Sequence, residues 1–472
     1  MSLKQPLEDW KWPPSYDDTY LPANNDQPYW FPIRETMAPE DRDELILTRI
    51  QDVMAYAWDH APFYRRKWTV AGLEPGDIKS LDDYARVPVV EKAELRLDQE
   101  ENPPFGSYLS VDREEVTHIN GTSGTTGRPT AFGINERDWR AVANAHARVM
   151  WAMGIRPTDT VLIGSPLSLY WGSWGAYIGA ERLGATVFPF GAGVAGQSLR
   201  TIQWMKQMGV TVFYGTPSYA LRLAEVATDA GISPDTLGLR TMFFSGEPGA
   251  SIPAVRDRIA GAFNAAVYDS GNMAEVSPWM SLGGDQDGPG MLCWQDLVYT
   301  QVCDPSTYLP VPYGSEGTPV YTTLERTSQP MIRLLSNDLT KWEAPATDGR
   351  RTYPRLPRGI YGRIDDMFVV RGENIYPSAI DDVVMQLPGY GGEHRIVISR
   401  ESTMDDLLVQ IEHREYTTAE TSAWTNRVAD ELQAVLGIRA RVVAVAQNTF
   451  DRTDFKARRV IDDRRLFLTG DN

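Results

Sequence analysis

Short β-rich runs alternate with helical segments between residues 135 and 271, and this alternation restricts the fold more than any other feature. The β-rich runs are closed by Gly, Ser or Pro, and they cover 159–166, 185–190, 210–217, 239–249 and 265–271. The other segments are predicted helices at 135–154, 197–209, 217–231 and 250–264. Strands that alternate with helices in this way form a largely parallel sheet with helices on both faces. The predicted fold class is therefore α/β, and we expect ligands at the loops that follow the strands.

The pattern divides the chain into three parts. Residues 1–40 are rich in Trp, Tyr, Pro and Asp and are predicted to form an extended arm that lies on the main body, with a partner subunit as the alternative surface. The large domain, 41–364, begins with an amphipathic helix expected at 41–67 with its end near Pro62. Hairpin-like strands after residue 290 add a β-rich subdomain to it. The remaining part, 366–472, alternates helix and strand and is predicted to be a small α+β domain.

Length and charge exclude several classes of protein. A chain of 472 residues is expected to form more than one domain. Its formal charge of −17, without a long Lys/Arg block, disfavours nucleic acid as a partner. No apolar run is long enough for a membrane span and no secretory leader is recognisable, so we expect a cytoplasmic protein. Cys293 and Cys303 give no disulfide framework or four-cysteine zinc site and are expected to be reduced.

The segment NGTSGTTGRPTAFG, residues 120–133, has the composition of a phosphate-binding loop. Its hydroxyl groups can donate hydrogen bonds, and its glycines let backbone N–H groups turn toward one point without interference from Cβ atoms. It lacks the Gly-Lys-Ser/Thr ending of a Walker A loop, which disfavours a switch-type NTPase. On composition alone, an ordinary surface loop stays an alternative.

A second glycine cluster, GAGVAG at 191–196, fits the dinucleotide-binding pattern G-x-G-x-x-G. That pattern needs an acidic residue at the end of the next strand, where it holds a ribose. The next run, VTVFYGTP at 210–217, contains no acidic residue. We therefore expect an ordinary turn or a loop on the substrate side rather than a dinucleotide site.

Four segments occur in the order typical of one known superfamily: THINGTSGTTGRPTAFG, FFSGEPG, GRIDDMFVVRGENIYPSAIDDVV and FDRTDFKARRVIDDR. Through them the chain resembles adenylate-forming enzymes over most of its length, and it is most similar to the phenylacetate–coenzyme A ligase branch. The resemblance implies that ATP and a carboxylate form an acyl-adenylate and pyrophosphate, after which the acyl group passes to the thiol of coenzyme A. ATP, Mg²⁺ and coenzyme A are the implied cofactors, and an aryl or arylacetic acid is the expected substrate.

The residue types agree with this chemistry. A carboxylate is already a nucleophile, so adenylation needs positive charge around the phosphorus rather than a Ser-His-Asp or Cys-His pair. The five histidines have no triad or metal-ligand spacing, and no G-x-S-x-G motif occurs. We therefore expect the histidines to be structural.

The resemblance also implies an ATP site. The residues implied for the phosphates are Thr122, Ser123, Gly124, Thr125, Thr126 and Gly127, and Thr126 is counted among the catalytic groups. The segment implied to lie beside adenine is Ser245, Gly246, Glu247 and Pro248. An ordinary acid at a helix start is the alternative for Glu247. Asp269 is a further ATP-binding residue, and Asp338 and Arg363 would hold the ribose hydroxyls.

The remaining implied residues concern the metal, the acyl group and the thiol. Glu275 would hold Mg²⁺, a hard cation that prefers oxygen ligands. Lys456 would be the catalytic lysine, carried to the α-phosphate by a small domain that rotates about a hinge at Asp365. The path of the thiol would be lined by Arg371 and Gly372. The acyl pocket is expected at Tyr170, Trp171 and Trp174, with core packing as the alternative for these rings.

Four features depart from the family pattern. Thr130 stands where many members of the superfamily have a lysine, as is usual in this branch. Gly271 and Asn272 replace the Tyr and Gly of an adenine-stacking motif, so either a stacking ring comes from elsewhere, for example from Tyr268, or the nucleotide lies differently. Phe455 replaces a glycine before the catalytic lysine. Gly271 and Phe455 leave open a nucleotide-binding protein without catalysis. Because acceptors vary within this fold, an adenylate passed to an amine or a carrier-protein thiol is a second alternative. A homodimer also stays open.

Overall fold

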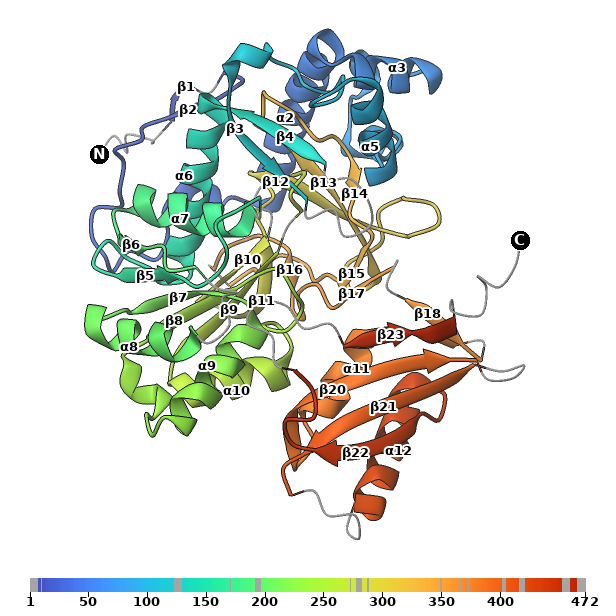
Figure 1. Cartoon of the computed structure of the whole chain (residues 1–472). Coiled ribbons are helices and arrows are strands. Elements are labelled where there is room, and N and C mark those ends of the chain that lie inside the picture. The colour runs from blue at the N-terminus through green and yellow to red at the C-terminus, as the bar shows by residue number, and fades with distance from the viewer. Residues whose placement is uncertain are drawn as a thin grey trace.

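A large α/β body and a separate, smaller C-terminal domain make up the computed structural model, which confirms the expected fold class (Figure 1). The structure describes residues 7–9, 11–122, 130–169, 171–191, 197–271, 273–276, 282–286, 288–348, 350–364, 367–371, 373–400, 405–415, 421–451 and 459–464. Among these residues, no helix has both the length and the apolar character needed to cross a membrane.

An eight-stranded sheet in the order β16-β11-β10-β9-β8-β7-β5-β6 forms the centre of the large body. Its parallel strands match the β-rich runs of the sequence: β6 (Thr186–Phe188), β5 (Thr160–Ile163), β7 (Val212–Gly215), β8 (Thr241–Phe244) and β9 (Ala266–Gly271). The other half of the sheet is antiparallel and was not predicted: β10 (Leu282–Asp285), β11 (Gly288–Cys293) and β16 (Arg355–Leu356). The five strands within 135–271 are therefore parallel, as predicted, and three antiparallel strands make the whole sheet mixed.

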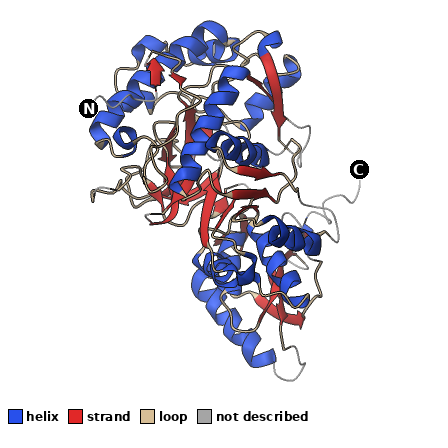
Figure 2. Cartoon of the chain, turned by 90° about the vertical axis from the view of Figure 1, so that its left-hand side faces the viewer, coloured by secondary structure: helices blue, strands red, loops and turns tan. Residues whose placement is uncertain are grey.

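Two groups of helices cover the two faces of the parallel strands (Figure 1, Figure 2). On one face lie α6 (Glu136–Ala152) and α7 (Trp171–Leu183). On the other lie α8 (Ser198–Met208), α9 (Pro217–Asp229) and α10 (Pro253–Phe263). Successive residues of a strand point to opposite faces, and accordingly Val161 and Ile163 pack with the first group and Leu162 with the second. All of these helices except α7 were predicted.

A further core joins the N-terminal helices to a second sheet. The helices are α2 (Pro39–His60), α3 (Pro62–Val70), α4 (Leu81–Tyr84) and α5 (Lys92–Glu101). The sheet contains β12 (Val298–Cys303), β13 (Glu316–Thr323), β14 (Leu334–Leu335), β15 (Asp338–Lys341) and β17 (Gly362–Arg363). The helix expected at 41–67 does end near Pro62, because the residue before a proline favours an extended backbone, but a second helix begins there.

The N-terminal arm lies on the large body, as predicted. It contains β1 (Leu7–Asp9), β2 (Ser15–Tyr16) and α1 (Pro32–Glu35). Trp30 is fully buried in the core that contains α6 and α7. Glu35 of α1 is also buried, and it forms ion pairs with Arg148 of α6 at 3.0 Å and with Arg351 at 2.8 Å. The arm is therefore an integral part of the large body.

The C-terminal domain has its own sheet and core. A hairpin of β18 (Phe368–Val370) and β19 (Glu373–Ile375) precedes a sheet in the order β22-β21-β20-β23. Its remaining elements are α11 (Pro377–Met385), β20 (Tyr390–Ser399), β21 (Asp406–His413), α12 (Thr421–Leu436), β22 (Arg441–Ala446) and β23 (Val460–Asp462). The alternating helices and strands expected here from the sequence are present, and their apolar faces form one cluster.

The C-terminal domain contacts the large body mainly through α11 and the start of β20. Arg358 Nη2 donates a hydrogen bond to Asp382 Oδ2 at 2.8 Å. The guanidinium carbon of Arg258, on α10, lies 5.7 Å from the centre of the Tyr390 ring. Met385 packs against the apolar clusters of both parts. These contacts hold the two parts in the arrangement of Figure 1.

Candidate active site

The carboxyl ends of the parallel strands meet at the edge where the sequence predicted ligand binding. Ser245 directly follows β8 at this edge and is buried, and its Oγ lies 2.6 Å from Tyr214 Oη of β7. Gly164 and Gly215 also lie here, on either side of the Phe213 ring. A Cβ atom at Gly164 would stand 2.5 Å from that ring, so only glycine fits this close approach. This edge of the sheet is thus closely packed, and it carries the hydrogen-bonded hydroxyl groups of Ser245 and Tyr214.

The loop rich in glycine and threonine lies on a separate hairpin formed by β3 (Val116–Gly121) and β4 (Ala131–Asn135). Its two ends bind each other, since Thr122 N donates to Thr130 O and Thr130 N donates to Thr122 Oγ1, both at 3.1 Å. A Cβ atom at Gly121 would lie 2.9 Å from Thr130 O. The hairpin therefore brings together the two ends of the predicted phosphate loop. Ser123, Gly124, Thr125, Thr126 and Gly127 lie outside the described residues.

Glu247 contacts the start of a helix. Its carboxylate accepts a hydrogen bond at 2.7 Å from the backbone N–H of Ser218, in the first turn of α9. Amide groups at a helix start carry a partial positive charge that favours such an acid. This is the alternative that the sequence left open for Glu247, although the helix is α9 rather than the next helix along the chain. Gly246 has a φ of 95°, which lets the chain turn between Ser245 and Glu247.

Asp269 lies in β9 and is only 3% exposed. Its Oδ2 accepts a hydrogen bond at 3.0 Å from the backbone N–H of Ser251, in the segment that leads to α10. Burial raises the pKa of this carboxyl to about 7, against the opposing effect of the Ser251 hydrogen bonds. Asp269 thus connects the end of the sheet to the start of α10 and titrates near neutral pH.

Tyr268, the ring considered as a substitute for the missing adenine-stacking residue, lies in β9. Successive side chains of a strand point to opposite faces, so Tyr268 lies on the face of β9 opposite to Asp269 and Gly271. It packs against the core of α6 and α7. A side chain at Gly271 would instead meet Met291 and Ile360. The strand alternation therefore puts Tyr268 on the other face of β9 from the position of the missing ring.

The predicted ribose-binding pair is brought together by two strands. Asp338 of β15 and Arg363 of β17 are paired residues in an antiparallel ladder. Arg363 Nη1 lies 3.5 Å from Asp338 Oδ1, and both side chains are partly exposed. The backbone N–H of Asp338 is bound by Ser336 Oγ at 3.0 Å, which fixes the strand end that carries the carboxylate. An acid and a neighbouring cation at an accessible strand end suit a hydroxyl-rich ligand.

Glu275 lies in a turn after β9, and its side chain is 4% exposed. Lys92, at the start of α5, has its Nζ 3.7 Å from Glu275 Oε1. Within the described residues, no hydrogen-bond donor reaches the carboxylate and no cluster of three His, Cys, Asp or Glu could hold a metal ion. A single carboxylate nevertheless fits a Mg²⁺ ion carried by ATP, since Mg²⁺ takes most of its ligands from phosphate and water. Glu275 therefore suits the expected metal role only together with ATP.

The sequence did not single out two residues beside Glu275, Lys92 and Arg326. Arg326 Nη1 donates to the carbonyl oxygens of Glu275 at 2.9 Å and Val276 at 2.7 Å. The sequence gives little signal for this contact. Arg326 lies in TTLERTSQP, a loop without regular periodicity, and it is 51 residues away from Glu275.

Of the aromatic residues expected to line the acyl pocket, Trp171 packs in the core. Trp171 is 2% exposed, and its ring centre lies 5.3 Å from that of Trp139 on α6. Trp139 in turn stacks on His118 of β3 at 3.7 Å. Trp174 Nε1 donates to Ser168 O at 2.8 Å. Core packing, the alternative that the sequence left open, therefore holds for Trp171, and Trp174 is the more accessible of the two.

Several predicted residues lie outside the described part of the chain, namely Tyr170, Asn272, Asp365, Gly372, Phe455 and Lys456, as does 192–196 of the second glycine cluster. Arg371 is described, next to Gly372. It donates to Asp405 O at 3.0 Å and to Asp406 Oδ1 at 3.2 Å. Arg371 thus ties the β18–β19 hairpin to the start of β21 in its own domain.

Comparison with known proteins identifies the family. The AMP-binding enzyme family matches residues 72–320, and the AMP-binding enzyme C-terminal domain matches residues 372–464. Phenylacetate-coenzyme A ligase of Thermus thermophilus is 31% identical over 452 residues, which cover 92% of this chain and 99% of that protein. The chain therefore belongs to the adenylate-forming AMP-binding enzymes, in the branch of the phenylacetate–coenzyme A ligases. Its reaction class is AMP-forming ligation of an acid to coenzyme A.

Solved structures include a more similar protein. A 2-hydroxyisobutyryl-CoA ligase in the postadenylation state, in complex with 2-HIB-AMP, is 58% identical with a TM-score of 0.93 and 98% coverage of both chains. The same enzyme in complex with 2-HIB-AMP and CoA in the thioesterification state has equal identity and coverage but a TM-score of 0.75. Because the sequences match equally well, the lower score reflects a different arrangement of the structure. The arrangement in Figure 1 is more similar to that ligase's structure in the postadenylation state than to its structure in the thioesterification state.

Proposed function

We propose that this protein uses ATP to convert a short, branched 2-hydroxy carboxylic acid into an acyl-adenylate and then transfers the acyl group to coenzyme A. The observation that carries the proposal is the 57–58% identity over 98% of both chains to a 2-hydroxyisobutyryl-CoA ligase. Relatives named phenylacetate-coenzyme A ligase are only 31% identical. The specificity of the acyl pocket is expected to resemble that of the relative with the higher sequence identity.

The packing around α7 supports a small acid. Trp171 lies against Trp139 in the core and offers little of its ring to a ligand. At the ends of β5 and β7, Gly164 and Gly215 leave no room for side chains, because the Phe213 ring lies there. A compact acid needs less apolar wall than an aryl group and depends more on a few polar contacts.

Adenylation needs positive charge and precise binding of ATP rather than a general base, because the carboxylate is the nucleophile. In this proposal the loop from Thr122 to Gly127 binds the phosphates, and Asp338 with Arg363 binds the ribose. Lys456 brings an ammonium group to the α-phosphate and the carboxylate. Glu275 would hold Mg²⁺, which when bound would neutralise charge on the phosphates.

Thioester formation uses a second arrangement of the C-terminal domain, with Asp365 as the hinge and the Gly372 segment beside the thiol. The different TM-scores for the postadenylation and thioesterification states of the similar ligase support this step. Domain rotations of this kind expose one face of the small domain at a time.

The test is a comparison of acids with the purified protein, ATP, Mg²⁺ and coenzyme A. Pyrophosphate release and acyl-CoA, identified by mass spectrometry, are followed for 2-hydroxyisobutyrate, lactate, isobutyrate, phenylacetate and benzoate. We expect the highest kcat/KM for 2-hydroxyisobutyrate. The ratio over isobutyrate should be about tenfold or more, because a site that binds a hydroxyl leaves buried polar groups unpaired with the analogue.

Each other outcome has a defined meaning. Pyrophosphate release without thioester would indicate an amine or a carrier-protein thiol as the acceptor. No release with any acid would overturn the proposal in favour of nucleotide binding without catalysis. A preference for phenylacetate or benzoate would favour the second candidate, an aryl-acid ligase, which rests on the names of the relatives at 31% identity.

A further inference from the structure

Arg326 is a buried cation that holds the turn carrying Glu275. It is 6% exposed, and one of its terminal nitrogens, Nη1, donates to the carbonyl oxygens of both Glu275 and Val276. A turn between a strand and a loop leaves such carbonyl groups without partners, and a guanidinium group supplies donors with fixed geometry. The backbone that carries the Glu275 carboxylate is therefore fixed from the side of Arg326.

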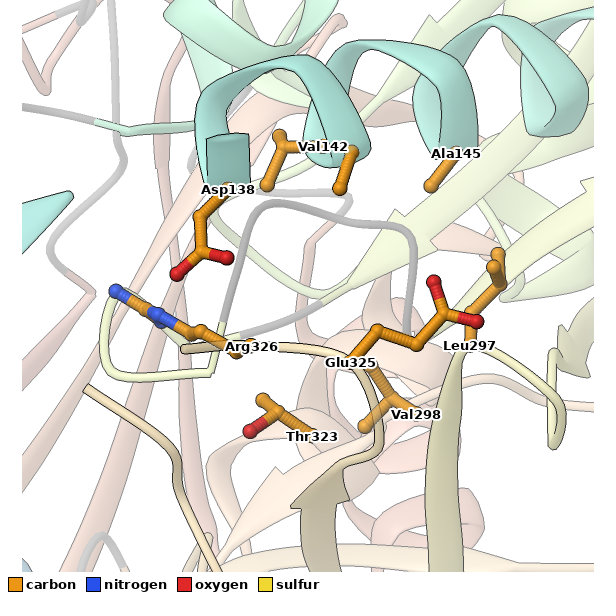
Figure 3. Close-up of a pocket in the computed structure, with 9 residues that line it drawn as sticks. Asp138, Val142, Ala145, Leu297, Val298, Thr323, Glu325 and Arg326 are labelled. Atoms are coloured by element: carbon orange, nitrogen blue, oxygen red, sulfur yellow. The ribbon is translucent and has the colours of Figure 1, made fainter. Parts of the chain in front are cut away.

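The segment that carries Arg326 is itself fixed by α6. Asp138, in the first turn of α6, is 2% exposed and accepts hydrogen bonds from the backbone N–H groups of Thr327 and Ser328 and from both of their hydroxyl groups. Figure 3 shows Asp138 pointing from α6 toward Arg326 across a small pocket. A rigid chain of contacts thus runs from α6 through Asp138 and Arg326 to Glu275.

The second terminal nitrogen of Arg326, Nη2, is buried and has no hydrogen-bond partner among the described residues. Arg326 also lines the pocket of Figure 3, together with Asp138, Thr323 and Glu325. Burial lowers the pKa of Arg326, while Asp138 nearby raises it, so the charge is retained at neutral pH. A buried charge is kept in this position at a cost in solvation. The hydrogen bonds that Arg326 donates to the Glu275 turn offset part of this cost.

We propose that Arg326 is a positioning residue for the metal step. By binding the carbonyl oxygens of Glu275 and Val276, it sets the direction of the Glu275 carboxylate toward the Mg²⁺ of bound MgATP. The inference rests on the proposed role of Glu275. Small errors in the position of a ligand matter, because Mg²⁺ demands near-ideal octahedral geometry. Arg326 itself touches neither the metal nor ATP in this proposal.

The test measures metal binding directly as well as activity. Mn²⁺ replaces Mg²⁺, and its dissociation constant in the presence of a non-hydrolysable ATP analogue is measured by electron paramagnetic resonance. In Arg326→Met, which keeps the length of the side chain without its donors, Mn²⁺ affinity should fall about tenfold, the worth of a hydrogen bond to a charged group. Affinity for the metal-free analogue should stay unchanged. KM for MgATP should rise, while KM for the acid stays unchanged.

A double-variant comparison separates positioning from general damage. If Arg326 acts through Glu275, the combination of Arg326→Met and Glu275→Gln should bind Mn²⁺ no more weakly than Glu275→Gln alone. Arg326→Lys, which retains the charge, should restore part of the affinity. Arg333→Met is the matched control. Arg333 is also a buried arginine bound to backbone carbonyls, those of Tyr84 and Tyr308, so its loss should lower the melting temperature and leave Mn²⁺ affinity unchanged.

The outcomes distinguish the two levels of the proposal. If Glu275→Gln weakens Mn²⁺ binding and folded Arg326→Met does not, only the role of Arg326 is wrong. If Glu275→Gln binds Mn²⁺ like the wild type, the metal role of Glu275 fails and the inference fails with it. Losses that multiply in the double variant would also contradict positioning. Should Arg326→Met not fold, Arg326→Lys replaces it in the same comparison, because a single ammonium cannot reproduce the fork of a guanidinium.

Discussion

Asp269 is a single carboxyl group whose titration should be measurable in the stability of the whole protein. Burial raises its pKa from 3.8 to about 7, so the folded protein keeps this proton over a range in which the unfolded chain has lost it. The stabilisation is fully present below about pH 4 and is lost as the pH rises through about 7. Relative to Asp269→Asn, the wild type should therefore lose on the order of 2 kcal/mol of unfolding free energy between pH 5 and pH 8.

Urea unfolding of both proteins at the two pH values measures this difference. Asparagine retains an oxygen that can accept the hydrogen bond from Ser251, so the variant removes the titration and keeps the contact. Asp229→Asn, at the exposed end of α9, controls for the loss of one charge. A difference between wild type and Asp269→Asn that is the same at pH 5 and pH 8 would show that the buried carboxyl does not titrate in this range.

Some residues of the candidate site could be predicted from the sequence, and others could not. Asp338 and Arg363 were expected at one site, and the pairing of β15 with β17 does bring them together. Lys92 and Arg326 were not expected beside Glu275, because they reach it through tertiary packing of α5 and of the segment after β13. A local sequence motif therefore indicates the kind of chemistry at a site. The cations that lie beside Glu275 come from distant parts of the chain, and no local sequence pattern indicates them.

At the scale of elements, the buried ion pairs of α1 hold the N-terminal arm on α6. Arg148 of α6 is 1% exposed and bridges Glu35 of α1 and Asp296. Burial alone would raise the pKa of Asp296, but Arg148 and Arg34 outweigh it and lower that pKa to about 2. Removal of Arg148 takes from Asp296 its nearest cation and from Glu35 one of its two, while both carboxylates stay buried. We expect Arg148→Met to reduce the free energy of unfolding by about 3 kcal/mol or more, measured by urea unfolding.

Arg140→Met is the control on the same helix. Arg140 is 62% exposed and pairs with Glu136 and Asp18 at the surface, where an ion pair contributes about 1 kcal/mol or less. Limited proteolysis adds a second measurement, since a loosened arm should be cut faster in Arg148→Met than in Arg140→Met. Equal losses in the two variants would mean that the buried pairs do not anchor the arm.

The elements that sequence reasoning missed have a common cause. The run from β10 to β11, LGGDQDGPGMLC, contains four glycines and no β-branched residue, so its propensity predicts a loop. Its strands exist because they pair with β9 and β16. Helix α7 begins WGSWGAYIG, and its glycines lower the helix propensity. It is held by packing on α6 and the sheet. In both cases tertiary contacts override local preference.

At the scale of the whole molecule, the C-terminal domain is held on the large body by few contacts. The ion pair of Arg358 and Asp382 is partly exposed, at 50% and 25% for the two side chains, so it contributes about 1 kcal/mol or less. The cation–π contact of Arg258 and Tyr390 and the packing of Met385 add to it. A contact of this size can hold the C-terminal domain in one arrangement and still break when the domain moves. This agrees with the different TM-scores for two states of the similar ligase.

A crosslink across this contact should separate the two half-reactions. Arg358→Cys with Asp382→Cys puts two thiols where the ion pair joins the large body to α11. The native Cys293 and Cys303 are free, as expected from the sequence, and completely buried. Burial raises the pKa values of their thiols to about 12 and about 11, so a maleimide will not label them readily. The crosslinker is a bismaleimide with a cleavable disulfide spacer, long enough to replace the arginine side chain.

The crosslinked protein should not form acyl-CoA, because the domain stays in the postadenylation arrangement, and pyrophosphate release should stop after a single turnover. Both activities should return when a reductant cleaves the spacer. Each single-cysteine variant, treated in the same way, should keep its activity, which controls for modification of one side. The measurements are pyrophosphate release in a rapid-quench experiment and acyl-CoA by mass spectrometry. Thioester formation by the crosslinked protein at the rate of the cleaved protein would mean that thioester formation proceeds without a change in domain arrangement.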